Sequence, residues 1–361
     1  MTTPCDIFDE YLASRPKLAL VRLDRQRLHQ SDLAHLAEYK EGLQALTISA
    51  KHRYPSLPVL NFYWLDEVDL NGIAIRYQNE LFIGLTYGVV QSSYKLFNTM
   101  LSWPQVLPTV GDPLLEKAPA QQFRRRRRWG RIEEDRIDTI RPACPVRARY
   151  ARHLENLVVE QFMFHEFTHI MHGHAGYFDS FRGPENVLVT RTTEMDADVG
   201  ALSTQMSNIA TRVLNKNSLP ETFQLFYNNV TGSVFDLAFA LASIFHIFEN
   251  YFAVSLDMNL NKDSNTIFRL RLRMLIEWAM QFVNQFIGIE HHHSCGQAML
   301  DGIEQARNAY ALVTGETRDS KPISLPSGDP EWDHLLDLTN FWRSTLRSAL
   351  EPYAYRELPR Y

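Results

Sequence analysis

Two histidines four residues apart, His165 and His169, together with Glu166, could hold and use a metal ion. Residues four apart on a helix stand one above the other, so both imidazoles can reach the same ion. Glu166 lies one position round the helix, where its carboxylate can take a proton from water as a general base. Neutral imidazole is a common ligand of Zn²⁺, and a catalytic zinc keeps one coordination position open. The pattern therefore predicts a catalytic zinc site.

The stretch around these residues favours a helix. Residues 158–172 are mostly apolar and contain neither proline nor glycine before Gly173, which is typical of a buried helix that ends at a glycine. The alternative is that His165 and His169 are two core histidines with ordinary hydrogen-bond partners and no metal.

A catalytic zinc needs a third protein ligand, and two patterns compete for that role. Metzincins place a glycine and a histidine three and six residues after the second motif histidine. Those positions hold His172 and Ala175 here, which excludes that pattern. The other pattern places a glutamate on a later helix, and residues 192–198 predict the start of one, with threonine in the capping position and acids in the first turn. We therefore expect Glu194 to be the third ligand.

Asp198 follows Glu194 by four residues and so lies on the same face of that helix. A histidine that binds a metal usually donates its other N–H to a carboxylate or carbonyl, and Asp198 can accept it from His165 or His169. His172 and His174 are expected to be structural or rim residues, because a site with three ligands does not need them.

HExxH at residues 165–169, followed by Glu194 and Asp198 on a second helix, resembles the gluzincin metallopeptidases. The resemblance implies Zn²⁺ on His165, His169 and Glu194, with Glu166 as the general base and Asp198 behind a ligand histidine. Within this class, the order of elements and the late apolar helix are similar to the Lit phage-exclusion peptidases. That similarity implies proteolysis of an intracellular protein, for Lit a translation elongation factor, in phage defence or a stress response.

The rest of the chain predicts an α+β fold that is predominantly α-helical, with a small β-hairpin or sheet packed on the zinc-binding helices. Alternating apolar residues and a turn predict a hairpin within residues 71–85. Its second strand, Leu81–Leu85, is the expected edge strand for an extended substrate; the alternative is a hairpin that only covers the helices. We divide the chain into a helical N-terminal extension (1–60), a metallopeptidase core (61–290) with a basic loop (104–145), and a C-terminal helical segment (291–361).

Further candidates lie after the two motifs. Tyr177 and His291, the first of three histidines at 291–293, are candidate donors to the oxyanion of a tetrahedral intermediate, and the histidine run could also form a second metal site. On a predicted helix over 267–286, Arg269 or Arg273 is expected to reach the cleft.

The most apolar stretch, Val234–Val254, is long enough to cross a membrane but contains Asp236, His246 and Glu249. We therefore expect a buried core helix and no membrane span. Asp236 and His246 need partners in such a helix, so we expect them to face the metal site or each other.

Composition is that of an ordinary soluble protein, with 45% hydrophobic and 22% charged residues in 361. The net charge of −5 gives no general attraction to nucleic acid. Arg124–Arg128 is the exception, but three acids follow it at 133–135, and we do not expect nucleic-acid binding. Three cysteines without paired spacing and an N-terminus without signal-peptide features predict a cytoplasmic location.

These observations predict a zinc-dependent endopeptidase whose partner is a protein or peptide substrate. The alternative is a non-catalytic or toxin-like binding effector with a structural zinc and a basic interaction surface. The substrate, the scissile bond, the activating trigger and the oligomeric state do not follow from the sequence.

Overall fold

The computed structural model describes residues 3–16, 20–24, 26, 28, 30–119, 123, 140–180, 187–255, 264–315 and 330–360. The arginine run Arg124–Arg128 lies outside the described residues. The protein is 71% helical and has one small mixed sheet, so the predominantly α-helical α+β class is confirmed.

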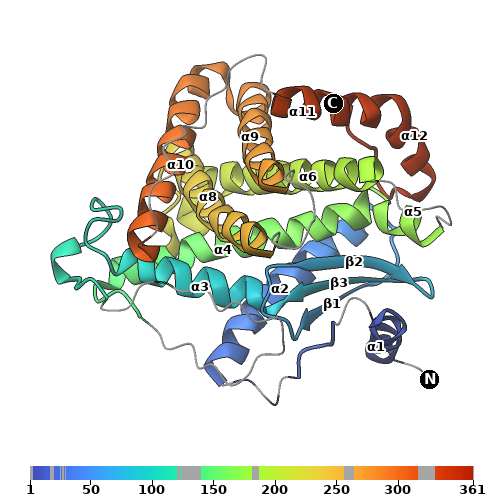
Figure 1. The fold of residues 1–361 in the computed structure, drawn as a ribbon, viewed down its shortest axis with the longest axis horizontal. Coiled ribbons are helices and arrows are strands. Elements are labelled where there is room, and N and C mark those ends of the chain that lie inside the picture. The colour runs from blue at the N-terminus through green and yellow to red at the C-terminus, as the bar shows by residue number, and fades with distance from the viewer. Residues whose placement is uncertain are drawn as a thin grey trace.

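Helices surround a sheet that is small and lies at one side of the molecule (Figure 1). The strands are β1 (Leu60–Leu65), β2 (Gly72–Tyr77) and β3 (Glu80–Thr86). The α-helices are α1 (Pro4–Ser14), α2 (Gln30–Arg53), α3 (Tyr87–Leu101), α4 (Pro145–Met171), α5 (His174–Ser180), α6 (Val187–Leu214), α7 (Glu221–Gln224), α8 (Val230–Ser255), α9 (Ser264–Phe282), α10 (His292–Thr314), α11 (Pro330–Phe341) and α12 (Arg347–Leu350).

The predicted hairpin is present, but the sheet contains one more strand than we predicted. β2 and β3 pair antiparallel around Gln78 and Asn79, whose φ angles of 49° and 65° suit a two-residue turn. β1 adds in parallel on the other side of β3, which gives the order β1-β3-β2. The expectation that Leu81–Leu85 forms an edge is therefore wrong, because these residues belong to the central strand. β2 is an edge strand instead.

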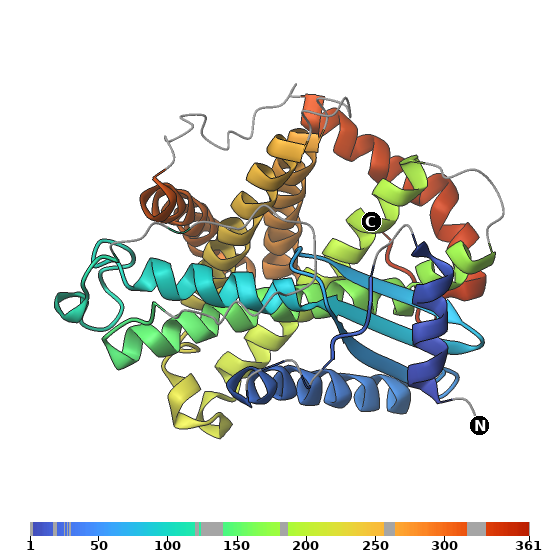
Figure 2. The same ribbon diagram turned by 60° about the horizontal axis from the view of Figure 1, so that its bottom comes forward.

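The two faces of the sheet contact different helices. On β3, Leu81, Ile83 and Leu85 belong to the main hydrophobic core, which also contains residues of α4. The intervening Phe82 packs on the opposite face, where its ring stacks on Phe8 of α1 with centroids 5.2 Å apart. Figure 2 shows α1 lying across this face. The sheet thus separates α1 from the helices that carry the motif residues.

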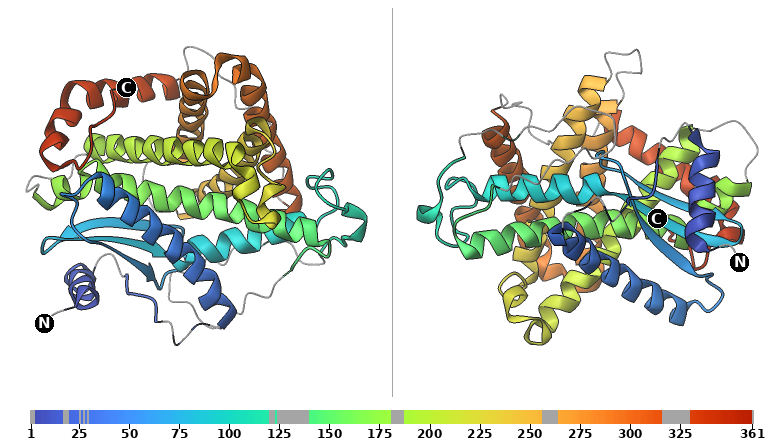
Figure 3. Two further views of the ribbon diagram at one scale, coloured as in Figure 1. Left: turned by 180° about the vertical axis from the view of Figure 1, so that it is seen from behind. Right: turned by 90° about the horizontal axis from the view of Figure 1, so that it is seen from below.

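α4 and α6 run antiparallel and side by side, as Figures 1 and 3 show. They approach closely because small residues face the contact. A Cβ atom on Gly200 of α6 would lie 2.5 Å from Cγ2 of Thr168 on α4, so no side chain fits there. Ala197 and Ala201 on either side of it are fully buried. This close approach brings the two predicted motifs together.

α8 is the predicted apolar helix. Residues 230–247 are long and apolar enough to cross a membrane by length and composition, and 72% of this window is buried inside the protein. The expected partner of Asp236 is wrong. Asp236 contacts Tyr150 and His153 of α4, the latter with Nε2–Oδ2 at 3.1 Å, rather than the metal site or His246. The His246 ring instead lies 5.4 Å from that of Tyr310.

The three predicted segments of the chain share one hydrophobic core. The main cluster of buried side chains includes Leu36 and Leu43 from α2, Leu157 from α4 and Val313 from α10. The helices that carry the motifs are therefore packed between elements from both ends of the chain.

Arg147, in the first turns of α4, holds the loop after α3 in place. Its side chain is fully buried, and its guanidinium donates to the carbonyl oxygens of Leu101, Trp103, Val106, Leu107 and Val110 at 2.7–3.0 Å. Burial lowers the pKa of Arg147, although the nearby Glu116 opposes this effect. A buried cation with five acceptors replaces the hydrogen bonds that water would otherwise make to this loop.

We predict that Arg147→Met lowers the free energy of unfolding by about 3–5 kcal/mol, because five carbonyl groups lose a buried donor. Urea denaturation followed by circular dichroism measures this change. Arg149→Met on the exposed side of the same helix is the control, with an expected change within about 0.5 kcal/mol. Equal, small effects of the two substitutions would contradict this role.

Candidate metal centre

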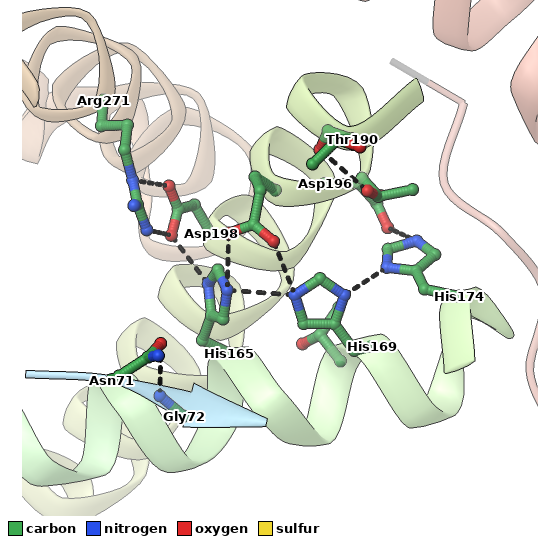
Figure 4. Close-up of polar contacts among 12 residues, drawn as sticks. Asn71, Gly72, His165, His169, His174, Thr190, Asp196, Asp198 and Arg271 are labelled. Atoms are coloured by element: carbon green, nitrogen blue, oxygen red, sulfur yellow. Dashed lines mark hydrogen bonds and ion pairs between the residues drawn. The ribbon is translucent and has the colours of Figure 1, made fainter. Parts of the chain in front are cut away.

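His165, His169 and Glu194 converge on one point between α4 and α6. Figure 4 shows the two histidines beside each other on α4. The two Nε2 atoms of the histidines lie 3.1 Å apart. The carboxylate oxygens of Glu194 lie 3.2 Å from Nε2 of His165 and 3.4 Å from Nε2 of His169. The structure therefore brings together all three predicted ligands, and this group could hold a metal ion.

The three separations fit a tetrahedral metal site. Ligand atoms at about 2.0–2.1 Å from a zinc ion, with tetrahedral angles, lie about 3.3 Å from one another. The two histidines are almost completely buried, while the side chain of Glu194 is 43% exposed. The group is therefore open to solvent on the side of Glu194, where a fourth ligand could enter.

Asp198 orients His165, as predicted. Its Oδ1 accepts a hydrogen bond from Nδ1 of His165 at 2.8 Å, which leaves the Nε2 lone pair free for a metal. Arg271 of α9 holds Asp198 in turn, through Nε–Oδ2 at 2.6 Å and Nη2–Oδ1 at 2.7 Å. Burial would raise the pKa of Asp198, but the charge of Arg271 and the contact with His165 hold it below its usual range.

His169 is held by a different set of residues. Its Nδ1 lies 2.9 Å from Nδ1 of His174, at the start of α5. Nε2 of His174 is 3.0 Å from Oδ2 of Asp196, and Nδ1 of His172 is 2.5 Å from the same oxygen. Burial lowers the pKa of His174 to about 4, even though Asp196 opposes this shift, so the ring is neutral near pH 7.

The charges around the three ligands suit a divalent cation. With neutral histidines, Glu166, Glu194 and Asp198 carry three negative charges and Arg271 one positive charge, which leaves two negative charges uncompensated. Burial alone would lower the pKa of His165, but its hydrogen bonds to Asp198 and Glu194 raise it to about 10. A proton on His165 partly balances the carboxylates, and a metal ion would replace that proton.

Glu166 lies beside the group and against the sheet. Its carboxylate and both histidines are almost completely buried, and burial raises the pKa of Glu166 while the two histidines oppose that shift. A Cβ atom added to Gly72, the first residue of β2, would lie 2.4 Å from Oε1 of Glu166. Only glycine therefore leaves room for this carboxylate at the strand.

The strand beside Glu166 has main-chain groups that point away from the sheet. Tyr77 and Glu80 close a two-residue turn, so they form a hydrogen-bonded pair, and the pairs of β2 and β3 alternate from there. Gly72, Ala74 and Arg76 belong to the non-hydrogen-bonded pairs of β2 and β3. Their N–H and C=O groups therefore point away from β3. Asn71 Oδ1 accepts the N–H of Gly72 at 2.9 Å.

One finer expectation about the site is wrong. The second helix does not begin at Thr192, because α6 already includes residues 187–191. An arginine that we did not predict, Arg271, contacts Asp198. The side chain of Arg269 lies outside the described residues, and Arg273 is buried.

Within the described residues, the two predicted oxyanion donors contact other side chains. Tyr177 lies on α5, where its ring packs against those of Phe178 and Tyr353. His291 lies just before α10 with a half-exposed side chain, and the ion pair described for it is with Glu290 at 3.9 Å. Neither residue is among the contacts described for the three ligands.

Sequence reasoning missed the residues that support the site. His174 and Asp196 were not assigned a part in it, although a second histidine pair close behind the motif and an acid between Glu194 and Asp198 were available signals. Gly72 carried no signal, since its role depends on which strand meets α4.

We predict that the purified protein binds one divalent metal ion per chain and that Glu194→Ala lowers its affinity for Zn²⁺ more than about 100-fold, because a ligand is lost. Competition with a chromogenic chelator measures the affinity, and elemental analysis measures the stoichiometry. Glu160→Gln is the control, because Glu160 pairs with Arg212 and lies outside the ligand group. Unchanged affinity in Glu194→Ala would show that Glu194 is not a ligand.

Comparison with protein-family models, with curated proteins and with solved structures finds no match in any of the three.

Proposed function

We propose that this protein is a zinc-dependent endopeptidase that hydrolyses peptide bonds of a protein or peptide substrate. The observation that carries the proposal is the position of Glu166. It follows a ligand histidine directly and lies against the edge strand, yet it is not part of the three-residue ligand group. A buried carboxylate next to a metal site and a strand edge can act on a substrate held there.

Two imidazoles and one carboxylate at tetrahedral spacing are a donor set that suits zinc. Structural zinc sites have four protein ligands, whereas this group has three and a partly exposed Glu194. The arrangement thus supports a catalytic site rather than the structural zinc of a binding effector. Zinc held there would act as a Lewis acid that activates water and stabilises the oxyanion of the transition state.

The edge strand β2 offers a way to hold an extended substrate. The outward main-chain groups of Ala74 and Arg76 can pair with a peptide, as strands are added to an open sheet edge in many complexes. Because Gly72 touches Glu166, a peptide that pairs along β2 would pass this carboxylate. Main-chain pairing does not depend on substrate side chains, which is consistent with hydrolysis of a peptide bond.

Glu166 provides the proton transfers of the reaction. It takes a proton from the attacking water as the water oxygen bonds to the carbonyl carbon of the substrate. It then returns this proton to the amide nitrogen as the carbon–nitrogen bond breaks, so the carboxylate is regenerated. Burial raises the pKa of Glu166, which makes it a stronger base than an exposed carboxylate.

The place of this activity in the cell is a proposal from the sequence resemblance. An intracellular substrate and a role in phage defence or a stress response follow from the similarity to the Lit peptidases. The ligand set from two helices and the acid behind His165 are consistent with the gluzincin class, to which we propose that the site belongs.

We predict that Glu166→Gln lowers hydrolysis at least about 100-fold while one Zn²⁺ is still bound, because the amide cannot accept a proton. The zinc-loaded protein and the variant are incubated with a peptide library made from a cell lysate, and mass spectrometry counts new N-termini. Cleavage by both forms at the same sites and rates would contradict the role of Glu166. Absence of cleavage by the wild type would contradict the proposed activity.

We also predict that Gly72→Ala lowers hydrolysis about 10- to 100-fold with unchanged zinc content, because the added Cβ displaces the Glu166 carboxylate. The same cleavage assay measures the effect. Gly42→Ala on α2 is the matched control, since a Cβ there meets no atom within 4 Å. Full activity of Gly72→Ala would show that the contact does not set the position of Glu166.

A further inference from the structure

A second group of histidines and an acid lies directly behind the metal ligands. His172, His174 and Asp196 place their nitrogen and oxygen atoms within 4.8 Å of one another. All three side chains are almost completely buried. The group could hold a second metal ion, or it could support His169, whose imidazole it touches.

The distances within this group favour hydrogen bonds over metal binding. Nδ1 of His172 and Oδ2 of Asp196 are 2.5 Å apart, which is much shorter than the separation of about 3.3 Å between two ligands of a tetrahedral zinc. Nε2 of His174 lies 3.0 Å from the same oxygen. Asp196 Oδ2 thus accepts a hydrogen bond from His172, while its contact with Nε2 of His174 has the distance of an ion pair without hydrogen-bond geometry.

The contact between His169 and His174 adds a constraint on the protons. Their Nδ1 atoms are 2.9 Å apart, so one must donate and the other accept. When His169 binds a metal through Nε2 as a neutral imidazole, its proton is on Nδ1, and His174 accepts it. A neutral His174 then carries its own proton on Nε2, the atom that faces Asp196.

The proton on Nε2 of His174 prevents His172, His174 and Asp196 from acting as a metal site. His174 could bind a metal through Nε2 only if its proton were on Nδ1, where it would be donated to His169. His169 would then carry its proton on Nε2 and could not bind the first metal. With neutral imidazoles, the two metal sites therefore exclude each other.

We propose that His174 and Asp196 position His169 for metal binding, and that His172, His174 and Asp196 do not hold a second metal ion. This inference rests on the proposed metal site. Asp198 supports His165 directly, whereas Asp196 supports His169 through the ring of His174 (Figure 4). His172 donates to Asp196 and fixes the oxygen that His174 contacts.

The test compares two substitutions of the same residue in the full-length protein. His174→Leu removes the acceptor of the His169 N–H, so we expect the affinity for Zn²⁺ to fall about 10- to 100-fold. His174→Asn keeps an acceptor, because its amide oxygen can occupy the place of Nδ1, and we expect affinity within about threefold of wild type. Competition with a chromogenic chelator measures each affinity, and circular dichroism verifies folding.

His153→Leu is the matched control. His153 is also buried and also contacts a buried acid, Asp236, at 3.1 Å, but it lies three turns before His165 on α4. We expect a loss of stability without a change in Zn²⁺ affinity. If His174→Leu binds Zn²⁺ as tightly as wild type, or if His174→Asn binds as weakly as His174→Leu, the proposed role of His174 is wrong.

Two measurements on the wild type test the proposal even if the leucine variant does not fold. Elemental analysis should find one zinc per chain, and nitrogen NMR should find the proton of His174 on Nε2 in the zinc-loaded protein. Two zinc ions per chain, or a proton on Nδ1 of His174 in the zinc-loaded protein, would overturn the inference. No bound zinc at all would overturn the proposed function as well.

Discussion

Two imidazole nitrogens and a carboxylate face one another at 3.1–3.4 Å between α4 and α6. If both nitrogens carry lone pairs, these atoms repel one another unless a cation lies between them. A proton on His165 balances part of this charge, and a metal ion would replace that proton. The surrounding contacts hold the two imidazoles in their positions. Asp198 and Arg271 do so for His165, and His174 does so for His169.

The axial register of α6 against α4 determines whether these contacts form. Thr168 packs where Gly200 has no side chain, and Nε2 of Gln205 donates to the carbonyl of Leu157 at 2.6 Å. Glu194 and Asp198 lie on one face of α6, while Asp196 points away from that face toward the turn after α4. One helix thus supplies a ligand and both supporting acids, so a small rotation of α6 would disturb all of them together. Such coupling explains the close packing of small residues at this interface.

The ligand group could be predicted from the sequence because its residues lie at fixed spacings within helices. His165 and His169 are four apart, as are Glu194 and Asp198, and helical geometry alone places each pair on one face. The order of strands could not be predicted in this way. No local sequence pattern indicates that β1 pairs in parallel with β3. This pairing places β3, the expected edge strand, in the centre of the sheet.

The contact of Arg271 with Asp198 could not be predicted for a related reason. Arg269, Arg271 and Arg273 have the same chemistry, and only the rotation of α9 about its axis decides which one meets Asp198. That rotation is set by packing against α6 and α8, which involves residues far away in the sequence. Similarly, the role of Gly72 follows from the contact of β2 with Glu166 and not from any local pattern. Tertiary packing therefore determines the roles of Arg271 and Gly72, which the motifs do not indicate.

The candidate metal site is closed to solvent on the side of His174 and Asp196. The chain near its C-terminus covers the turn after α4, where the N–H of Tyr355 donates to the carbonyl of Met171 at 2.9 Å. Gly173 in this turn has a φ of 82°, and a Cβ there would lie 2.5 Å from the main chain of Tyr353. His174 and Asp196 are thereby sealed from solvent, whereas Glu194 is not. A ligand can therefore approach the metal group from the side of Glu194, while the buried side is left to hold His169 in place.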